Sequence, residues 1–349
     1  MKVLLAYKPG ELRVVDMPKP VAGPGQVLSK VRYSGICGTD ISIMNGTLNL
    51  GPGTEPIYPV RLGHEWSGTV VEVGPDTAKL KVGDNVISDT QYSCGVCEYC
   101  LKGEYNACIH GRAIGTIGNC WPGSFAEYML TMERSTFKVP QNVPLDQAAL
   151  IEPAAIGLYG LTRAQVGPGK NLLILGTGAI GLGGMACAKG MGIGKTILAG
   201  RKDAKLAIGK QLGADILVNT TRENLHDVVM RETDGRGMDM IMDTTGDTGI
   251  FNDIVEMLRG SGFLVIPGFY EQDLKDVKLD RIISRNCTLV GVAGTPNMAP
   301  RILDMLSNRH INFAPMITDR FPFSKVTEAF QSFSGRGDSR IKIMVEFDA

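Results

Sequence analysis

Hydrophobic and polar positions follow different patterns in the two halves of the chain. Before residue 140, short strand-like runs lie between frequent glycine and proline residues, as at 26–33, 68–73 and 85–89. After residue 170, apolar runs alternate with helical segments. The runs are 170–175, 196–199, 216–218, 240–242, 263–266 and 288–292, and the helical segments include 182–191, 203–212, 225–232 and 250–259. The first pattern predicts a compact, turn-rich β domain. The second predicts an α/β domain with a doubly wound parallel sheet.

The size and charge of the chain narrow the classes of function. Its 349 residues are expected to form two domains. The 36 basic and 36 acidic residues cancel, and aromatic residues make up only 6%, which argues against nucleic acid or an anionic membrane as a partner. Residues 171–188 carry no charge, but their glycines favour a buried strand, turn and helix over a membrane span. The N-terminus does not resemble a signal peptide, so we expect a cytoplasmic protein.

Four of the eight cysteines lie close together, with a spacing typical of a metal site. They are Cys94, Cys97, Cys100 and Cys108. The short gaps allow one loop to wrap a tetrahedral ion, with Gly95 and Gly103 supplying sharp turns. Four protein ligands leave no open position, so the predicted site is a structural zinc site. The alternatives are free thiols in a loop, or a nucleic-acid zinc ribbon, for which little basic charge lies nearby.

Two further segments carry potential zinc ligands. Cys37, Thr39 and Asp40 follow the end of a predicted strand, and His64 and Glu65 precede another. A lone cysteine or a lone His-Glu pair is more often structural than functional. Together, a cysteine, a histidine and nearby carboxylates can build a zinc site with an open position. The sequence by itself does not show that these residues converge.

A glycine motif follows the first strand of the predicted α/β domain. It reads Gly176-Thr177-Gly178-Ala179-Ile180-Gly181, with a strand before it and a helix after it. The first glycine allows a tight turn, the second lets the backbone approach a pyrophosphate, and the third lets the helix pack on the strand. The free N–H groups at the start of the helix would face the phosphates. The motif therefore predicts a dinucleotide-binding site.

The end of the next strand bears on the choice of cofactor. NAD enzymes usually place an acidic residue there to bind the ribose 2′-hydroxyl group, whereas this chain has Gly200, Arg201 and Lys202. Glycine removes a carboxylate that would repel a phosphate, and the guanidinium group of Arg201 can clamp one. We therefore predict NADP in preference to NAD. In the alternative, Arg201 and Lys202 are solvated surface charges and Asp203 reaches the ribose.

In order, these motifs resemble those of the zinc-dependent medium-chain alcohol dehydrogenases, most strongly the sorbitol/polyol and threonine dehydrogenase branch. The shared order is Cys-Gly-Thr-Asp, Gly-His-Glu, CX2CX2CX7C, Glu-Pro and GXGXXG. The resemblance covers essentially the whole chain. It implies a GroES-like β-rich catalytic domain at 1–153 with a C-terminal return at 293–349, a Rossmann dinucleotide-binding domain at 154–292, and an active site between the domains.

The resemblance also implies roles for individual residues. Cys37 and His64 would bind a catalytic zinc ion, with Glu65 and Glu152 as ligands or neighbours of that ion. Asp40 would orient His64, and Thr39 would pass the alcohol proton. The four-cysteine cluster would hold a structural zinc, giving two Zn²⁺ ions per chain. Such an enzyme transfers hydride between NAD(P) and a secondary alcohol or polyol, or the corresponding ketone.

Three positions depart from the family pattern. Ser42 and Tyr159 stand where many relatives have histidine, and residues 291–296 lack the arginine that sugar-alcohol enzymes use. These departures favour a less polar alcohol or ketone over a sorbitol-like polyol. The family also implies a homodimer or homotetramer, in which the strand at 288–292 extends a sheet between subunits. The alternative function is a binding or structural protein on the same fold, but a chain without zinc chemistry would have no reason to keep these ligands.

Overall fold

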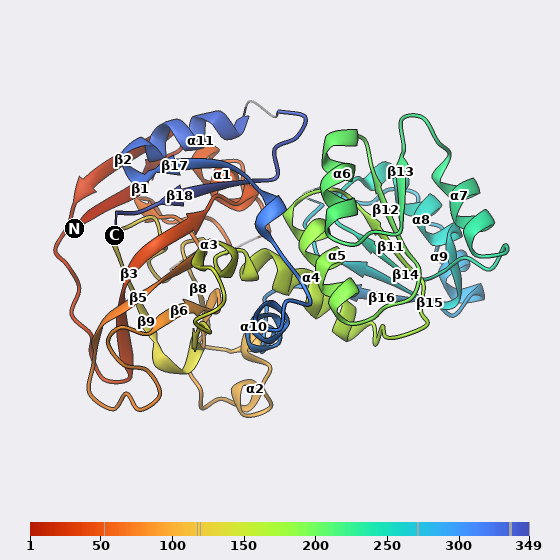
Figure 1. Cartoon of the computed structure of the whole chain (residues 1–349). Helices are drawn as coiled ribbons and strands as arrows, with labels where there is room; N and C mark the ends of the chain where they lie inside the picture. Colours follow the sequence, from red (N-terminus) through yellow and green to blue (C-terminus); the bar gives the residue numbers. More distant parts are fainter. Residues whose placement is uncertain (52, 117, 119, 271, 335–336, 349) are drawn as a thin grey trace. The chain divides into compact units, whose positions relative to one another are not determined.

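The computed structural model describes residues 1–51, 53–116, 118, 120–270, 272–334 and 337–348 (Figure 1). The chain forms two compact units. The first comprises Met1–Glu152, Gly294–Ser307 and the chain from Ile317 onward, and the second comprises Pro153–Ala293 and Asn308–Met316. The domain limits given above stay a prediction, and this division differs from them chiefly at residues 308–316.

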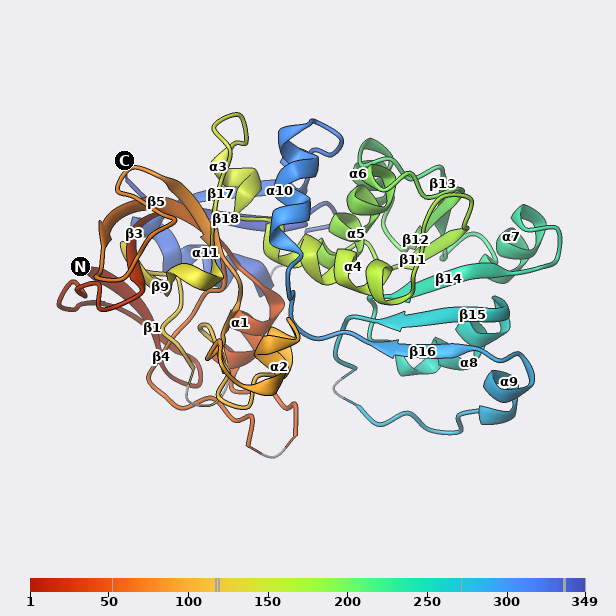
Figure 2. The same cartoon turned by 90° about the horizontal axis from the view of Figure 1, so that it is seen from below.

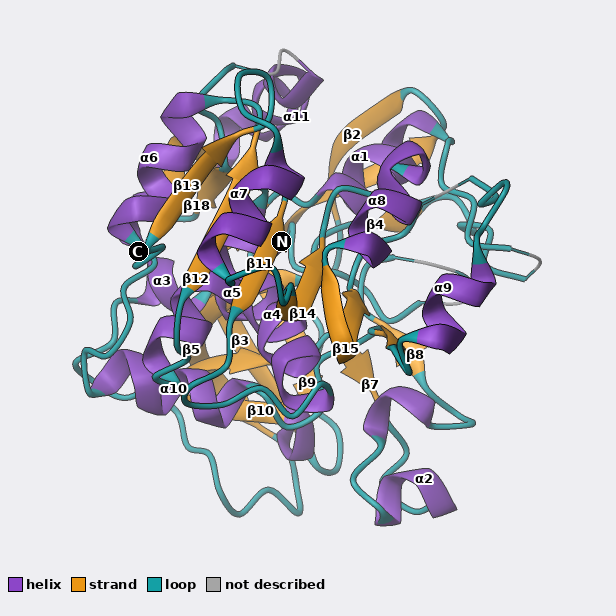
Figure 3. Cartoon of the chain, turned by 90° about the vertical axis from the view of Figure 1, so that its right-hand side faces the viewer, coloured by secondary structure: helices purple, strands orange, loops and turns teal. Residues whose placement is uncertain are grey.

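The first unit is built on β-sheets (Figure 3). Its largest sheet has the order β10-β6-β5-β3-β18-β17, with β9 also paired to β3. These strands are β3 (Gln26–Gly35), β5 (Glu65–Val73), β6 (Asn85–Ser88), β9 (Tyr128–Met132), β10 (Thr136–Lys138), β17 (Ile317–Pro322) and β18 (Lys342–Glu346). A second sheet has the order β2-β1-β4, and a third pairs β7 with β8. Their strands are β1 (Lys2–Lys8), β2 (Glu11–Asp16), β4 (Val60–Arg61), β7 (Gln91–Tyr92) and β8 (Arg112–Ala113).

Short helices connect these strands. They are α1 (Gly38–Asn45), α2 (Glu98–Leu101), α3 (Leu145–Ala148), α10 (Ala299–Ser307) and α11 (Val326–Ser334), with 3-10 turns at Tyr105–Ala107, Glu133–Ser135 and Phe323–Lys325. The C-terminal segment is part of the core of this unit. β18 runs antiparallel to β3, and the buried rings of Phe125 and Phe330 meet edge to face at 5.1 Å. Since burying an aromatic side chain contributes about 1.5–3 kcal/mol, the C-terminal segment helps to stabilise this unit.

The second unit contains one six-stranded sheet with the order β13-β12-β11-β14-β15-β16. Every pairing in this sheet is parallel, and β14 to β16 lie side by side in Figure 2. The strands are β11 (Leu172–Leu175), β12 (Thr196–Gly200), β13 (Ile216–Asn219), β14 (Met238–Asp243), β15 (Leu258–Ile266) and β16 (Thr288–Gly291). This order is that of the Rossmann fold, so the predicted doubly wound parallel sheet is confirmed.

The helices of the second unit largely follow the predicted alternation. They are α5 (Ala179–Gly190), α6 (Asp203–Gln211), α7 (Leu225–Glu232), α8 (Phe251–Glu256) and α9 (Leu279–Ser284), with 3-10 turns at Thr248–Ile250 and Ala314–Met316; α4 (Ile151–Arg163) contains the boundary between the units. None of the helices in the described ranges is long and apolar enough to cross a membrane.

The predicted helix at 250–259 is wrong at its end. Helix α8 stops at Glu256, and β15 already begins at Leu258. Leu258 is buried and pairs with Met238 of β14, and the guanidinium group of Arg259 forms an ion pair with Asp239 at 2.8 Å. Pairing with the neighbouring strand therefore overrides the local helical pattern.

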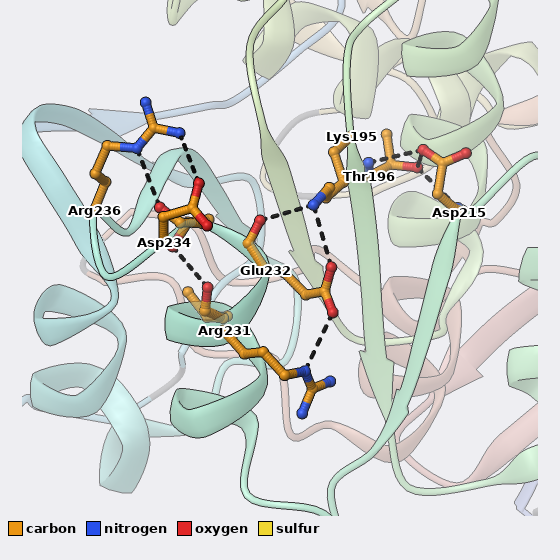
Figure 4. Close-up of polar contacts among 9 residues, drawn as sticks. Lys195, Thr196, Asp215, Arg231, Glu232, Asp234 and Arg236 are labelled. Carbon is orange, nitrogen blue, oxygen red and sulfur yellow. Dashed lines mark hydrogen bonds and ion pairs between the residues drawn. The ribbon is translucent and has the colours of Figure 1, made fainter.

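At the end of the sheet opposite the glycine motif, polar contacts join the start of β12 to neighbouring segments of the second unit (Figure 4). Lys195, just before β12, donates to the backbone oxygen of Glu232 at 2.8 Å and to its carboxylate at 3.2 Å. Thr196 donates from its backbone and its hydroxyl group to Asp215 at 2.9 and 2.8 Å. These contacts lie at the amino ends of the strands, whereas ligands of such sheets bind at the carboxyl ends. We interpret them as structural.

Candidate active site and cofactor site

The four cysteines of the predicted structural site converge. Their four sulfur atoms all lie within 4.8 Å of one another; the residues are Cys94, Cys97, Cys100 and Cys108. The Sγ atoms of Cys94 and Cys100 are 3.9 Å apart, as are those of Cys97 and Cys108. A tetrahedral zinc ion with Zn–S bonds of about 2.3 Å requires sulfur atoms about 3.8 Å apart. The donor set and its geometry therefore fit zinc.

The backbone around this cluster favours thiolates. The N–H group of Cys97 donates to the sulfur of Cys94, and that of Cys94 to the sulfur of Cys108, each at 3.3 Å. A backbone N–H group of Cys100 helps to lower the pKa of Cys97 to about 6. Gly95 and Gly103 have φ angles of 79° and 80°, which glycine adopts without strain. These contacts favour the thiolate, the form that binds metal, at Cys94 and Cys97, whereas burial raises the pKa of Cys100 to about 12.

A second candidate metal site lies where β3, α1 and β5 meet. Cys37 is the N-cap of α1 and follows β3 after Ile36, and His64 precedes Glu65, the first residue of β5. Strands β3 and β5 pair with Gly35 opposite Glu65, which brings the three side chains together. One ligand atom from each of Cys37, His64 and Glu65 lies within 4.8 Å of the other two.

Asp40 fixes the backbone next to both Cys37 and His64. Its carboxylate accepts the backbone N–H group of Cys37 at 2.9 Å and that of Gly63 at 3.0 Å. The first contact caps α1, and the second fixes the residue before His64. Oδ1 of Asp40 is also 3.7 Å from Nδ1 of His64. Asp40 is fully buried, and this burial raises its pKa although both backbone contacts oppose the rise.

Two buried polar atoms of the site have no hydrogen-bond partner among the described residues. They are Nδ1 of His64 and Oε2 of Glu65. Burial lowers the pKa of His64, but Asp40 and Cys37 outweigh this effect and raise it well above its ordinary value. Since buried polar atoms are nearly always paired, Oε2 of Glu65 fits a cation, whereas Nδ1 of His64 faces Asp40 at 3.7 Å. A thiolate, an imidazole and a carboxylate are also the ligands that zinc prefers, and three of them leave a fourth position open.

Lys342 of β18 is a component of the site that sequence reasoning missed. Its Nζ atom lies 2.7 Å from Oε1 of Glu65 and 3.1 Å from the backbone oxygen of Ile36. Burial lowers the pKa of Lys342, but Glu65, Cys37 and Glu152 together outweigh this effect, and the pKa is raised. The sequence contained one sign that Lys342 is buried, because this lysine interrupts the apolar run Ile341 to Val345. A lysine in such a run calls for a buried anionic partner.

Two predicted residues lie beside this three-residue cluster. Glu152, in the first turn of α4, is outside the three-residue group that could share an ion. Its pKa rises to about 7, mainly because the surrounding protein removes water from its carboxyl group, while the charge of His64 opposes the rise. Thr39 lies near Cys37, with its hydroxyl oxygen 3.8 Å from the sulfur. Their roles stay predictions.

The glycine motif has the conformation that a dinucleotide requires. Gly176 has a φ angle of 102°. A Cβ atom on Gly181 would lie only 2.2 Å from the backbone oxygen of Gly176, so glycine is needed where the helix approaches the strand. Gly178 is exposed, and a Cβ atom there would meet open space. Gly178 is the N-cap of α5, which begins with Ala179 and Ile180, so their N–H groups are available to a phosphate.

The end of β12 carries the predicted cofactor-selecting residues. Arg201, Lys202 and Asp203 are exposed. A Cβ atom on Gly200 would lie 2.6 Å from Cγ2 of the buried Thr177, so a larger side chain does not fit there without movement. Oδ1 of Asp203 accepts from Asn219 at 2.7 Å and from Arg222 at 2.5 Å. The carboxylate of Asp203 is therefore already paired with a cation.

Comparison with known proteins agrees with the geometry. Residues 23–141 match the alcohol dehydrogenase GroES-like domain, and residues 179–308 match the zinc-binding dehydrogenase domain. The chain is 36% identical to D-arabitol-phosphate dehydrogenase of Enterococcus avium, over 99% of this chain and 97% of that protein.

Two similar solved structures contain a nicotinamide cofactor. A putative zinc-binding dehydrogenase of Sinorhizobium meliloti 1021 bound to NADP has a TM-score of 0.86 and 28% identity, covering 99% of this chain and 98% of that one. An alcohol dehydrogenase of Escherichia coli CFT073 complexed with NADH has a TM-score of 0.90 and 28% identity, covering 99% of both chains. With its two metal-ligand clusters and its parallel nucleotide-binding sheet, the chain belongs to the zinc-dependent medium-chain alcohol dehydrogenase family, in the branch of the polyol dehydrogenases.

Proposed function

We propose that the chain catalyses NAD(P)-dependent oxidation of a secondary hydroxyl group of a polyol or related alcohol, and the reverse reduction, at a zinc ion held by Cys37, His64 and Glu65. The observation that carries this proposal is the convergence of these side chains, with Oε2 of Glu65 lacking a hydrogen-bond partner among the described residues. When bound, zinc supplies a Lewis acid that acidifies the substrate hydroxyl group, and the nicotinamide accepts or donates the hydride.

The residues of the chain have separate tasks in this proposal. Asp40 fixes the backbone on both sides of the site and faces His64, so that Nε2 of His64 is left for the ion. Thr39 is placed beside Cys37 to take the proton of the substrate hydroxyl group. Glu152, with a pKa of about 7, can hold or release a proton near neutral pH. Ser42 stands where many relatives have histidine. The path by which the substrate proton reaches solvent would therefore differ from a path through histidine.

We propose a second, structural zinc ion at the four cysteines, which gives two ions per chain. The first unit would be the catalytic domain and the second the cofactor domain. Gly176 to Gly181 would bind the pyrophosphate.

The exposed edge strand β16 is compatible with a homodimer or homotetramer. Light scattering of the purified protein measures that state, and a monomer would contradict it.

For the cofactor we propose NADP. The space where an acidic side chain would bind the ribose is occupied by Thr177, and the carboxylate of Asp203 is paired with Arg222. Arg201 is left to face a 2′-phosphate. A charge-assisted contact of this kind contributes about 1.5–3 kcal/mol, so Arg201→Leu should lower kcat/KM for NADP about ten- to a hundred-fold and leave that for NAD unchanged. Arg231→Leu, at the other end of the sheet, is the control. A wild-type preference for NAD would contradict the proposal.

The similarity to D-arabitol-phosphate dehydrogenase supports a polyol or a phosphorylated polyol as substrate. The absence of an arginine at 291–296 instead favours a less polar alcohol. The test follows absorbance of the reduced cofactor over a panel of polyols, polyol phosphates, simple secondary alcohols and ketones, together with metal analysis. Turnover that disappears on zinc removal and returns on zinc addition is expected. Absence of turnover with every class, in protein that holds two zinc ions, would contradict the proposed function.

A further inference from the structure

The carboxylate of Glu65 is held asymmetrically. Lys342 is only 3% exposed and Glu65 is fully buried, and the ammonium group contacts Oε1 alone, at 2.7 Å. Oε2 has no hydrogen-bond partner among the described residues. A buried ion pair is stable only when its remaining atoms are also satisfied. The pair therefore accounts for one oxygen of the carboxylate and leaves the other for a different partner.

Gly35 provides the space that this arrangement needs. It lies opposite Glu65 in the pairing of β3 with β5, and opposite Met344 in the pairing of β3 with β18. A Cβ atom on Gly35 would lie 2.3 Å from Oε2 of Glu65 and 3.3 Å from Cδ of Lys342. Glycine is therefore the residue over which the side chains from the two neighbouring strands meet.

We propose that Lys342 and Gly35 are positioning residues for the catalytic zinc, because they hold Glu65 so that only Oε2 is offered to the ion. Lys342 occupies Oε1 from one side, and Gly35 leaves room for Oε2 on the other. A carboxylate that binds through a single oxygen keeps a coordination position open for the substrate. This inference rests on the proposed zinc site and adds two residues that do not themselves touch the ion.

The alternative is a purely structural ion pair. A structural pair would stabilise the first unit without any effect on metal affinity. Contacts that orient a ligand instead alter metal affinity, typically by ten- to a hundred-fold. Zinc affinity therefore separates the two interpretations, and thermal stability measured in parallel reports the structural contribution.

The experiment measures zinc affinity by competition with a chromogenic chelator, in the full-length protein. The zinc at the four cysteines serves as an internal reference. For Lys342→Met, we expect the zinc of the Cys37 site to be released at about ten- to a hundred-fold lower chelator concentration, with the reference zinc unchanged. Lys342→Arg, which keeps the charge, should recover most of the loss. Lys138→Met is the matched control, because Lys138 forms an ion pair of 2.6 Å with Asp84 elsewhere in the same unit.

Gly35→Ala tests the same idea from the other strand. The added methyl group should displace Oε2 and weaken zinc binding by a similar factor, although Lys342 is intact. Gly38→Ala is its control, since a Cβ atom there meets nothing within 4 Å apart from its chain neighbours and its own helix. Both pairs of variants are also compared by circular dichroism and Tm.

The outcomes are distinct. If the wild type binds zinc only at the four cysteines, the proposed function fails. If the wild type holds two ions and folded Lys342→Met and Gly35→Ala proteins release zinc as the wild type does, the proposed function stands and the positioning roles are refuted. If Lys342→Met does not fold, the affinity of Gly35→Ala decides between the two interpretations.

Discussion

The two metal-ligand clusters of this chain are constructed in opposite ways. Cys94, Cys97, Cys100 and Cys108 come from one short loop, supply four sulfur atoms and receive N–H groups from their own backbone. Cys37, His64 and Glu65 come from two segments, depend on β3 pairing with β5, and are supported by Lys342 from the far end of the chain. The first cluster can close around an ion without the rest of the fold. The second exists only when the sheet has formed.

This contrast separates stability from reactivity. Four thiolates saturate a tetrahedral ion, so the loop cluster stabilises its own segment and offers no position to a substrate. The sheet-borne cluster offers three ligands of mixed charge and leaves one position open. Loss of one ligand should therefore cost folding stability at the first cluster and turnover at the second. The first three of the following predictions test the two sides of this comparison, and the last uses a carboxylate outside both clusters as a reference.

The largest expected effect is on turnover at the sheet-borne site. Cys37→Ser should lower kcat at least about a thousand-fold, because a hydroxyl group replaces the thiolate ligand. Tm should change by only a few degrees, since Cys37 is partly exposed and β3 and β5 pair without it. Cys120→Ser is the matched control outside both clusters. Activity near the wild-type level in zinc-loaded Cys37→Ser protein would contradict the assignment.

The loop cluster should show the opposite result. Cys97→Ser removes one of four ligands, and we expect the free energy of unfolding to fall by about 3 kcal/mol, or Tm by roughly 10 °C. The kcat of the protein that remains folded should stay within a few-fold of the wild type. Calorimetry and metal analysis measure this effect. A stable variant with lost turnover would reverse the comparison.

Glu152 tests how far the reactive site extends. Glu152→Ala should lower kcat about ten- to a hundred-fold, the range typical of residues that transfer protons or surround a metal. Glu328→Ala is the control, since Glu328 is an exposed acidic residue in the first turn of α11. Unchanged turnover and zinc content would indicate that Glu152 is only a residue of the first turn of α4.

A buried carboxylate outside both clusters provides the smallest expected effect. Burial raises the pKa of Asp89 from 3.8 to about 7, and its Oδ1 atom has no hydrogen-bond partner among the described residues. Between these pH values the folded state holds a proton that the unfolded state has released. Stability therefore falls as pH rises from about 4 to 7. Asp89→Asn should remove this dependence and stabilise the protein by about 1–2 kcal/mol at pH 8. An unchanged profile of Tm against pH would refute it.

The loop cluster and the glycine motif could be predicted because their residues are neighbours in the sequence. The four cysteines lie within one loop, and Gly176 and Gly181 lie within one turn between a strand and a helix. Each motif can therefore be recognised from a short stretch of sequence. The meeting of Cys37 with His64 depends on the register of β3 against β5, which no local pattern specifies. Lys342 was missed because its partner Glu65 is 277 residues away. The helix predicted at 250–259 failed for the same reason, since pairing of Leu258 with Met238 ends it early.

Under the proposed preference for NADP, the contact between Gly200 and Thr177 also limits how the cofactor preference can change. Since the methyl group of Thr177 fills the space beside Gly200, an aspartate introduced at 200 in one step would be forced away from the ribose or would disturb the glycine motif. Replacing Thr177 with a smaller residue first would remove that obstacle. The two substitutions are therefore epistatic. From the proposed preference for NADP, a directed-evolution experiment that selects for NAD should recover a change at position 177 before one at position 200.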